Sequence, residues 1–400
     1  MKVRYQYRIY PTDQQRKHLS RLFGCVRVVW NDALRLCKQS EKLPSNGDLQ
    51  KICITQAKKT ALRKWLSEVS NIPLQQSIAD LGVAFKNFFE SRNGKRKGLK
   101  VNAPKFKKKD NRQTARFRKG GFSIKAGKVF LAKIGNIKTE WSRPLPSEPS
   151  SVTVIKDRAE RYFLSFVVEI QPRLIPAKNQ SVGIDLGLKT FAVLSTGEKI
   201  NSPDYSRLER KIRRAQRRFA KREKGSNRRH QMRLKIAKLK AKQADTRKDF
   251  LHKLSTKVVS DNQTIALEDL NVSGMLKNRC LSRAISQQGW REFRTMCETK
   301  SEKFGREFVV ISRWEPTSQV CSDCGYRWGK LDLKIRDVVC INCGAHHCRD
   351  ANAAKNIEKV GVGHTHDSKR TGRKCKTPHG AVSVELSTHL KDEQLNLFAC

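Results

Sequence analysis

The 400-residue sequence has few acidic residues and no long apolar run. Its 37 Asp and Glu residues face 84 Lys and Arg residues, which gives a formal net charge of +47. A chain so dominated by one sign repels itself unless a polyanion neutralises it. Nucleic acid is therefore the first partner to consider, and an anionic membrane surface is the alternative. No run approaches the ~18 apolar residues needed to span a bilayer, so we expect no membrane partner.

The sequence also lacks the marks of a secreted or disulfide-rich protein. Its first residues, MKVRYQYRIYP, contain no apolar stretch of the kind found in signal peptides. Twelve cysteines among 400 residues are too few for a disulfide scaffold. Apolar residues make up only 38%, but aliphatic runs recur throughout, which argues against general disorder. We expect a reduced, cytoplasmic, nucleic-acid-binding protein of roughly two to four domains.

Hydrophobic periodicity changes several times in the first half of the chain. Residues 1–10 alternate apolar and polar side chains, which predicts a half-buried strand, and Thr12 can cap a helix that follows. From about 12 to 90 the spacing is helical. Between 121 and 171 a period of two returns, which favours a small antiparallel sheet or barrel to which the first strand could pair. The helical segment would then be an insertion into a β domain.

Two segments concentrate the positive charge. Residues 91–120 contain thirteen Lys or Arg and a single acid, Asp110, and they include Phe106 and Phe117. A solvated loop is one interpretation; the aromatic residues favour phosphate contacts combined with base stacking. Between 207 and 248 nineteen Lys or Arg face three acids, on a helical pattern broken at Gly225. Such one-signed charge predicts a phosphate-facing helical hairpin rather than a solvated helix.

The remaining elements alternate strands and helices. The pattern predicts a buried run with a hairpin at 181–200, strands at 263–270 and 306–312, helices at 287–304 and 349–361, and a flexible tail beyond 363.

Four cysteines have the spacing of a zinc site. Cys321 and Cys324 form one Cys-x2-Cys pair, and Cys340 and Cys343 form another after fifteen residues. Each pair can supply two thiolates to one tetrahedral ion, and four thiolates leave no open position, so the zinc is structural. Gly325 and Gly344 follow the second cysteine of each pair, where a tight turn favours positive φ. We take the nearby His346, His347 and Cys348 to be bystanders.

Three carboxylates form a second group. Asp185 and Glu268 lie within apolar strands, where an acid is unfavourable unless something compensates it. Asp350 opens a helix, where an N-cap role is the simpler interpretation. If the two strands are neighbours, about 4.8 Å apart, the acids can share a cation. Carboxylates bind Mg²⁺, and two such ions about 4 Å apart can support phosphodiester hydrolysis.

Together these motifs resemble the TnpB family, which comprises OrfB-type proteins encoded by transposons and related to type V CRISPR effectors. The similarity extends over about residues 1–360. It is carried by YRIYP (Tyr7–Pro11), Trp30–Asn31, PLQQ (Pro73–Gln76), PKFK (Pro104–Lys107), GIDLG (Gly183–Gly187), EDL (Glu268–Leu270), the two cysteine pairs and RDANAA (Arg349–Ala354).

The resemblance implies a fold that combines α/β, β-barrel and helical parts. A RuvC (RNase H-like) nuclease domain would be interrupted by the four-cysteine zinc ribbon, and an N-terminal wedge barrel would carry an inserted helical recognition lobe. The implied boundaries are 1–10 for the first wedge strand, 11–100 for the recognition lobe, 101–178 for the wedge barrel, 179–313 for the first nuclease part, 314–346 for the target-nucleic-acid-binding zinc ribbon, 347–362 for the second nuclease part and 363–400 for the tail.

The implied activity is RNA-guided, Mg²⁺-dependent cutting of DNA next to a short flanking motif. Asp185, Glu268 and Asp350 match the family's catalytic acids and would hold two Mg²⁺ ions as shared carboxylate ligands. The cofactors are structural Zn²⁺, catalytic Mg²⁺ and a guide RNA derived from the transposon end. The partner is double-stranded target DNA, bound by one protein copy on one RNA. The expected location is the cytoplasm of a prokaryotic cell, at the nucleoid when DNA is bound.

The sequence departs from the family pattern at Cys348, where members often have Asp. Gln75 and Gln76 have amides suited to adenine edges and could read the flanking motif. Most other cations are expected to bind phosphate and carry no sequence information. The full set of expected nucleic-acid contacts is Gln75, Gln76, Lys105, Lys107, Arg116, Arg118, Arg214 and Arg218.

Three alternative functions stay open at this point. A guided DNA-binding repressor without useful cleavage is one, although this chain retains all three acids. A strand-transferring transposase is another, because its metal chemistry can use the same kind of acid triad. An unguided zinc-ribbon binder explains the charge and the cysteines but not the strand acids. The sequence also leaves open whether the protein belongs to a transposon or is a compact CRISPR-associated descendant.

Overall fold

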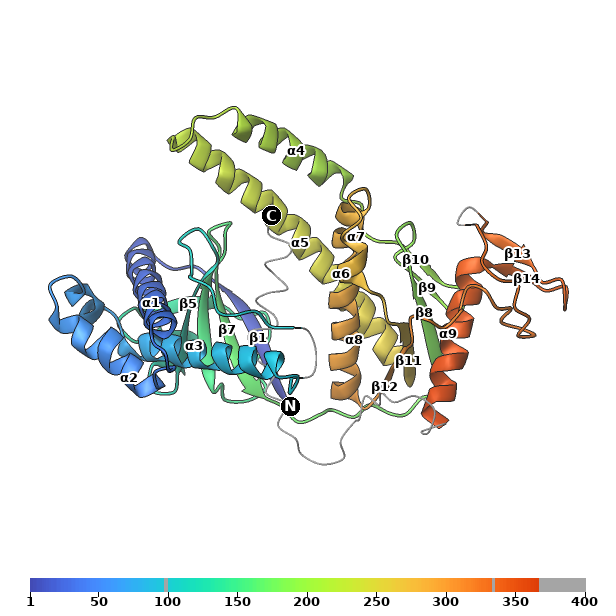
Figure 1. Cartoon of the computed structure of the whole chain (residues 1–400), viewed down its shortest axis with the longest axis horizontal. Helices are drawn as coiled ribbons and strands as arrows, with labels where there is room; N and C mark the ends of the chain where they lie inside the picture. Colours follow the sequence, from blue (N-terminus) through green and yellow to red (C-terminus); the bar gives the residue numbers. More distant parts are fainter. Residues whose placement is uncertain (97–99, 333–334, 367–400) are drawn as a thin grey trace. The chain divides into compact units, whose positions relative to one another are not determined.

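The computed structural model describes residues 1–96, 100–332 and 335–366 (Figure 1). The chain divides into two compact units: an N-terminal unit of Met1–Ile170, and a C-terminal unit that holds most of the chain from Gln171 onward. Most of the expected tail, residues 367–400, lies outside the described residues. None of the described helices is long and apolar enough to cross a membrane.

The N-terminal unit is built on a seven-stranded antiparallel sheet in the order β2-β6-β7-β1-β5-β4-β3. Its strands are β1 (Lys2–Ile9), β2 (Gln113–Arg118), β3 (Phe122–Lys125), β4 (Lys128–Leu131), β5 (Gly135–Glu140), β6 (Ser151–Lys156) and β7 (Tyr162–Glu169). The first strand lies between β7 and β5, so its expected pairing with the later strands is confirmed. Tyr7 and Ile9 face the core, as the alternating pattern of β1 requires.

The helices of this unit lie in the sequence between β1 and β2. They are α1 (Asp13–Gln39), α2 (Asn46–Gln50), a π-helical turn (Lys51–Gln56), 3₁₀ turns (Ala57–Lys59 and Lys64–Glu68) and α3 (Asn71–Arg92). Thr12 caps α1 in a reciprocal capping box with Gln15, which confirms the expected start. The α1 and α3 helices pack against each other, and the Ser77 hydroxyl donates a 3.1 Å hydrogen bond to the Val26 carbonyl.

The C-terminal unit contains a five-stranded sheet in the order β10-β9-β8-β11-β12. Its strands are β8 (Ser181–Leu186), β9 (Ala192–Leu194), β10 (Lys199–Ile200), β11 (Thr264–Glu268) and β12 (Glu307–Ile311). The strands β8, β11 and β12 run parallel, whereas β9 and β10 form the expected hairpin and pair antiparallel. The unit is therefore of mixed α/β type.

Helices cover both faces of this sheet (Figure 1). The helices of this unit are α4 (Ser206–Ala220), α5 (Asn227–Asp261), α6 (Val272–Met275), α7 (Ser282–Gln288), α8 (Trp290–Phe304) and α9 (Arg349–His366). On one face, Ile184 and Leu267 pack with Leu251 of α5 and Phe293 of α8. On the other face, Ala266 packs with Ile357 of α9.

Small residues let α9 approach the sheet closely. A side chain at Gly183 of β8 would meet the backbone of α9 at Ala354 and Glu358, and one at Gly361 of α9 would meet Ala266 of β11. The glycines thus set the depth at which α9 lies on the central strands. Because Asp350 belongs to the first turn of α9, the same packing determines where that carboxylate lies.

A two-stranded ribbon, β13 (Asp337–Val339) and β14 (His346–Cys348), leads directly into α9. Asn352 and Asn356 of α9 donate 2.7 Å hydrogen bonds to the Val320 carbonyl, next to the first cysteine pair. The ribbon and its cysteines are therefore held against the start of α9.

Candidate metal centres and nucleic-acid surface

Asp185 and Glu268 lie on neighbouring parallel strands. In the parallel register, Ile184 of β8 lies opposite Leu267 of β11. Asp185 follows Ile184 and Glu268 follows Leu267, so the two acids are also opposite each other. Ile184 and Leu267 face α5 and α8, and side chains alternate along a strand, so both acids point to the opposite face. That face carries α9, with Asp350 as its second residue. Three carboxylates from three elements thus share one face at the carboxyl end of the parallel strands.

The electrostatics of this face disfavour three free negative charges. Burial, followed by the charges of Asp350 and Glu268, raises the pKa of Asp185 to about 7. Burial and the neighbouring charge of Asp269 also raise the pKa of Glu268. Carboxylates crowded in this way are the oxygen ligands that hard cations such as Mg²⁺ prefer, and a cation would relieve their repulsion. The donor set therefore fits Mg²⁺.

Asp350 has a cationic partner from the cysteine-containing segment. The Arg336 guanidinium donates hydrogen bonds of 3.0 and 3.3 Å to the two carboxylate oxygens of Asp350. The Arg349 amide also donates a 2.7 Å hydrogen bond to the Arg336 carbonyl, which fixes the loop before β13 over the start of α9. One of the three acids is consequently paired with an arginine.

Asp269, next to Glu268 in the sequence, has a different environment. Burial tends to raise the pKa of Asp269, but hydrogen bonds from Arg313 and Arg294 outweigh it and hold that pKa below its ordinary value. The Arg294 and Arg313 bonds measure 2.7 and 3.2 Å. Asp269 is thus committed to an ion-pair network that joins the ends of β11, β12 and α8. Of this acidic pair, Glu268 is the residue left to face α9.

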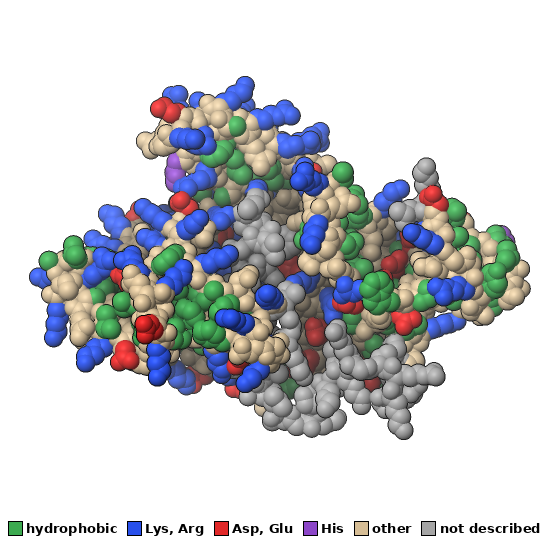
Figure 2. Space-filling view, viewed as in Figure 1, with side chains coloured by type: hydrophobic (Ala, Val, Ile, Leu, Met, Phe, Trp, Pro, Cys, Tyr) green, Lys and Arg blue, Asp and Glu red, His purple; other side chains and the backbone are tan. Residues whose placement is uncertain are grey.

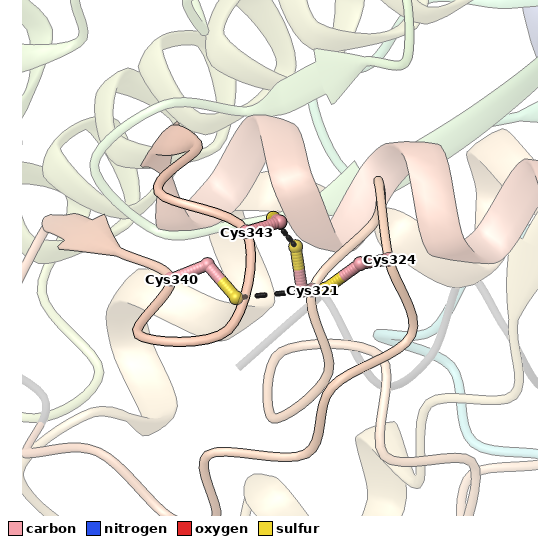
Figure 3. A group of neighbouring side chains, drawn as sticks. All are labelled: Cys321, Cys324, Cys340 and Cys343. Atoms are coloured by element: carbon pink, nitrogen blue, oxygen red, sulfur yellow. Dashed lines mark hydrogen bonds between the residues drawn. The ribbon is translucent and has the colours of Figure 1, made fainter.

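The four cysteines converge into one cluster. Their sulfur atoms all lie within 4.8 Å of one another, and the dashed pairs in Figure 3 show side chains from two loops that point inward. The Cys321–Cys343 and Cys324–Cys340 sulfur separations are 3.8 and 3.6 Å. A tetrahedral site with Zn–S bonds of about 2.3 Å requires sulfur separations of about 3.8 Å. The cluster can therefore bind zinc. In the described part of the chain no other set of ligand atoms, the three carboxylates included, is grouped so tightly.

The backbone of each cysteine pair forms the tight turn that the sequence predicts. Gly325 and Gly344 have φ values of 78° and 71°, and their amides donate hydrogen bonds to the carbonyls of Cys321 and Cys340. His347, which we expected to be a bystander, is buried and lies with its Nε2 atom 3.1 Å from the Cys321 sulfur. It is thus in direct contact with the cluster.

Four of the expected nucleic-acid contacts meet in the N-terminal unit. Gln75 and Gln76 of α3 lie beside Arg116 and Arg118 of β2: Arg118 donates a 3.4 Å hydrogen bond to Gln75, and Arg116 and Gln76 both bind Asp80. The charge of Arg116 is therefore balanced by Asp80, whereas Arg118 is exposed.

Hydrogen bonds from α1 hold the segment around Lys105 and Lys107. The Trp30 indole donates to the Lys105 carbonyl at 3.1 Å, and Asn31 exchanges two hydrogen bonds with the Lys107 backbone at 2.8 and 3.1 Å. The Lys107 ammonium lies 3.8 Å from the centre of the Trp30 ring, while the Lys105 side chain is exposed.

The expected role of Phe117 in base stacking is wrong. Phe117 belongs to β2 and is fully buried in the core of the N-terminal unit, because Ala115 and Phe117 form the inward face of that strand. Phe106 is 45% exposed, and the Lys38 ammonium lies 4.7 Å from its ring centre. Of these two residues, Phe106 is therefore the one whose ring is open to a base.

The expected basic hairpin is present as α4 and α5. Ile212 and Ala215 form the buried side of α4, and the expected contacts Arg214 and Arg218 lie on its exposed side. Lys and Arg side chains cover this hairpin at the top of Figure 2. The arrangement suits a polyanion, since almost all of these cations face outward.

Sequence reasoning missed Arg336, Arg294 and Trp314. Nothing local distinguishes Arg336 among the many cations of a chain with 84 Lys and Arg residues. Trp314 is 85% exposed at the end of β12, and a lone tryptophan near a strand end is usually interpreted as core.

Comparison with family models finds three matches. A model described as "Probable transposase" matches residues 165–279, a "Cas12f1-like, TNB domain" matches 290–357, and a "Helix-turn-helix domain" matches 1–42. The second of these includes all four cysteines and Asp350.

Similar proteins align over nearly the whole chain. A protein of Streptomyces pristinaespiralis named "Putative RNA-guided DNA endonuclease" is 42% identical over 394 residues, which cover 93% of this chain and 95% of that protein. Escherichia coli K12 has a protein named "Putative RNA-guided DNA endonuclease InsQ" that is 28% identical and covers 89% of this chain and 92% of its own length. Among solved structures, the Cas12f1 chain of a Cas12f1–sgRNA–target DNA complex matches this chain with a TM-score of 0.50 at 15% identity. The match covers 86% of this chain and 81% of the Cas12f1 chain, so the two share a fold.

Proposed function

The chain belongs to the TnpB (OrfB-type) family, and from this premise we propose that it is an RNA-guided DNA endonuclease. The observation that carries the proposal is the convergence of Asp185, Glu268 and Asp350 on one face of the C-terminal sheet. The relatives named as RNA-guided DNA endonucleases support the same activity.

In this proposal the C-terminal unit is a RuvC (RNase H-like) nuclease domain. Asp185 and Glu268, on adjacent parallel strands, and Asp350, on the helix packed across them, together hold Mg²⁺. When bound, Mg²⁺ activates water and neutralises charge at the scissile phosphate. The close packing of α9 at Gly183 positions Asp350 relative to the two strand acids. Arg336 must leave Asp350, at least in part, before that carboxylate can serve as a ligand.

The four-cysteine cluster holds zinc for a structural purpose. Four thiolates complete a tetrahedral shell, so the ion orders the loops around β13 and β14 and takes no part in the chemistry. The buried His347 imidazole beside Cys321 supports one of these sulfur atoms.

The partners follow from the charge and from the family. A guide RNA from the transposon end would neutralise much of the net charge of +47. The N-terminal unit would serve as wedge and recognition lobe, with Gln75 and Gln76 at the flanking motif of a double-stranded target. Base pairing with the guide would read the rest of the target, and one protein copy would act on one RNA.

The test is to co-purify the protein at high salt, sequence the retained RNA, and incubate the complex with Mg²⁺ and a plasmid library with a randomised flank. We expect wild type to retain one defined RNA and to remove plasmids with one particular flank from the library by cutting them. Asp185→Ala should retain the same RNA but leave those plasmids uncut. If wild type binds the guided target but does not cut it, the protein is a repressor and not a nuclease. If the products have joined rather than free DNA ends, the protein is a strand-transferring transposase.

A further inference from the structure

Trp314 is the most exposed tryptophan of the described chain. It is 85% exposed, whereas Trp65 is 36% exposed and Trp30 and Trp290 are buried. Leaving so large an apolar surface in water is unfavourable, by about 25 cal/mol for each Å². Tryptophan is enriched at binding interfaces, so an indole kept in solvent is a candidate for a binding role.

The loop that carries Trp314 is ordered by its own hydrogen bonds. The Trp314 amide donates to the Ser312 hydroxyl at 3.3 Å, and the Glu315 amide donates to the Ser312 carbonyl at 3.2 Å. The Thr317 amide then donates to the Glu315 carbonyl at 2.9 Å. The ring is therefore displayed by a defined turn.

Both ends of this loop are attached to elements that carry the proposed catalytic acids. On one side, Arg313 binds Asp269, the neighbour of Glu268 on β11. On the other side, the Thr317 carbonyl accepts a 2.8 Å hydrogen bond from Asn356 of α9, the helix that carries Asp350. Trp314 is thus anchored between β11 and α9, at the carboxyl end of the parallel strands.

We propose that Trp314 stacks on an unpaired base of the DNA strand that is presented to the three acids. The inference rests on the proposed nuclease function and adds a base-binding position to it. An indole ring in solvent recognises the face of any base, and stacking requires a base that is not already stacked within a duplex. Arg313 directly precedes Trp314 in the chain, and its side chain is 38% exposed although it is paired with Asp269. This cation next to the ring in the chain can attract the phosphate backbone of the strand.

The experiment uses the complete guide complex in an Asp185→Ala background, where the target is bound and not cut. A guide-matched target carries 2-aminopurine at single positions along the displaced strand, and its fluorescence is quenched where the base stacks on a ring. We expect quenching at one or two adjacent positions, its loss in Trp314→Ala and its retention in Trp314→Phe. Affinity for a displaced-strand oligonucleotide should fall about five- to hundredfold in Trp314→Ala.

Leu174→Ala is the matched control, because Leu174 is 74% exposed in the same unit, lies outside the cysteine-containing segment and has no ring. This variant should leave the 2-aminopurine quenching and the oligonucleotide affinity unchanged. Equal quenching and affinity in wild type and Trp314→Ala would overturn the inference while the nuclease assignment stands. Loss of both the quenching and the affinity in Leu174→Ala as well would show that exposed apolar area, and not the ring, binds the strand. If instead Asp185→Ala cuts the target as wild type does, the nuclease assignment itself fails.

Discussion

The four thiols around Cys321 and the three carboxylates beside α9 lie in the same unit but differ in how their ligands are arranged. The sulfur atoms already have the separations of a tetrahedral zinc site. The carboxylates share a face, where burial, followed by the charges of Asp350 and Glu268, raises the pKa of Asp185. Arg336 pairs with Asp350. A site that only has to hold its ion can be complete at all times. In the proposed function the acidic site also accepts substrate, and its ion pair with Arg336 can be replaced.

The largest effect should follow from breaking the thiol cluster. Structural zinc contributes about 10–16 kcal/mol of apparent binding free energy in small zinc domains. Replacing Cys340 by Ser should reduce the zinc content from about one ion per chain to nearly none. The backbone amides of β13 and β14 should then exchange their hydrogens faster. Cys280→Ser is the control, because Cys280 is exposed and lies outside the cluster. Unchanged zinc content in Cys340→Ser would contradict the assigned ligand set.

The cost of ionising Asp185, which comes from burial and then from repulsion by Asp350 and Glu268, can be measured through pH. The pKa of Asp185 is about 7 in the folded protein and about 3.9 when unfolded, so the folded state binds more protons between these values and stability falls as pH rises through this window. Asp185→Asn removes the titrating group. In EDTA at pH 8 the free energy of unfolding of Asp185→Asn should exceed that of wild type by up to about 4 kcal/mol, and its melting temperature should be higher. Near pH 4 the two proteins should be equally stable.

Glu302→Gln serves as its control, since Glu302 is an exposed carboxylate outside the acidic face. A stabilisation by Asp185→Asn that is equal at pH 4 and pH 8 would show that ionisation of Asp185 is not its cause.

A smaller effect should follow from pushing α9 away from the sheet. Gly183→Ala places a methyl group against the α9 backbone at Ala354 and Glu358, and overpacking of this kind costs about 1–3 kcal/mol. We expect a lower melting temperature and slower guided cleavage with zinc content unchanged. In Gly363→Ala, where a methyl group meets nothing within 4 Å, cleavage should stay at the wild-type rate. Equal cleavage by both variants would mean that the depth of α9 does not position Asp350.

The smallest effect concerns Arg336. Exposed ion pairs contribute about 0.2–1 kcal/mol, so Arg336→Ala should strengthen Mn²⁺ binding to the metal-free acids by about two- to fivefold. Calorimetric titration of the full chain measures this without relying on activity. Arg327→Ala, an exposed arginine of the same cysteine-containing segment, should bind Mn²⁺ like wild type. Weaker Mn²⁺ binding in Arg336→Ala would show that Arg336 supports the acids and does not compete for Asp350.

Features that depend on a few neighbouring residues could be predicted from the sequence. The Thr12 cap, the turns at Gly325 and Gly344 and the strand that carries Asp185 follow from local pattern and spacing, and the structure contains each of them. The alternation of β8 and β11 also places Asp185 and Glu268 on one face once the two strands are known to be neighbours.

Features that depend on distant contacts could not be predicted. The bond from Arg336 to Asp350 joins residues that come together only when the ribbon folds against α9. Asp269 and Glu268 look equivalent in the sequence, and only the arginines of α8 and of the loop after β12 separate their roles. The wrong prediction of base stacking by Phe117 has another cause. The many cations around Phe117 favoured a nucleic-acid-binding loop, whereas the segment is a strand whose inward positions are Ala115 and Phe117.

The most direct test of the central claim compares binding and cutting of one guide-matched duplex by wild type and by Asp185→Ala. In the proposed function the three acids hold Mg²⁺ and act on the chemical step, where several kcal/mol of stabilisation correspond to about a thousandfold or more in rate. We predict that Asp185→Ala binds the duplex within about twofold of wild type and cuts it at least about a thousandfold more slowly in a single turnover. Cutting by Asp185→Ala at a rate near that of wild type would contradict the account.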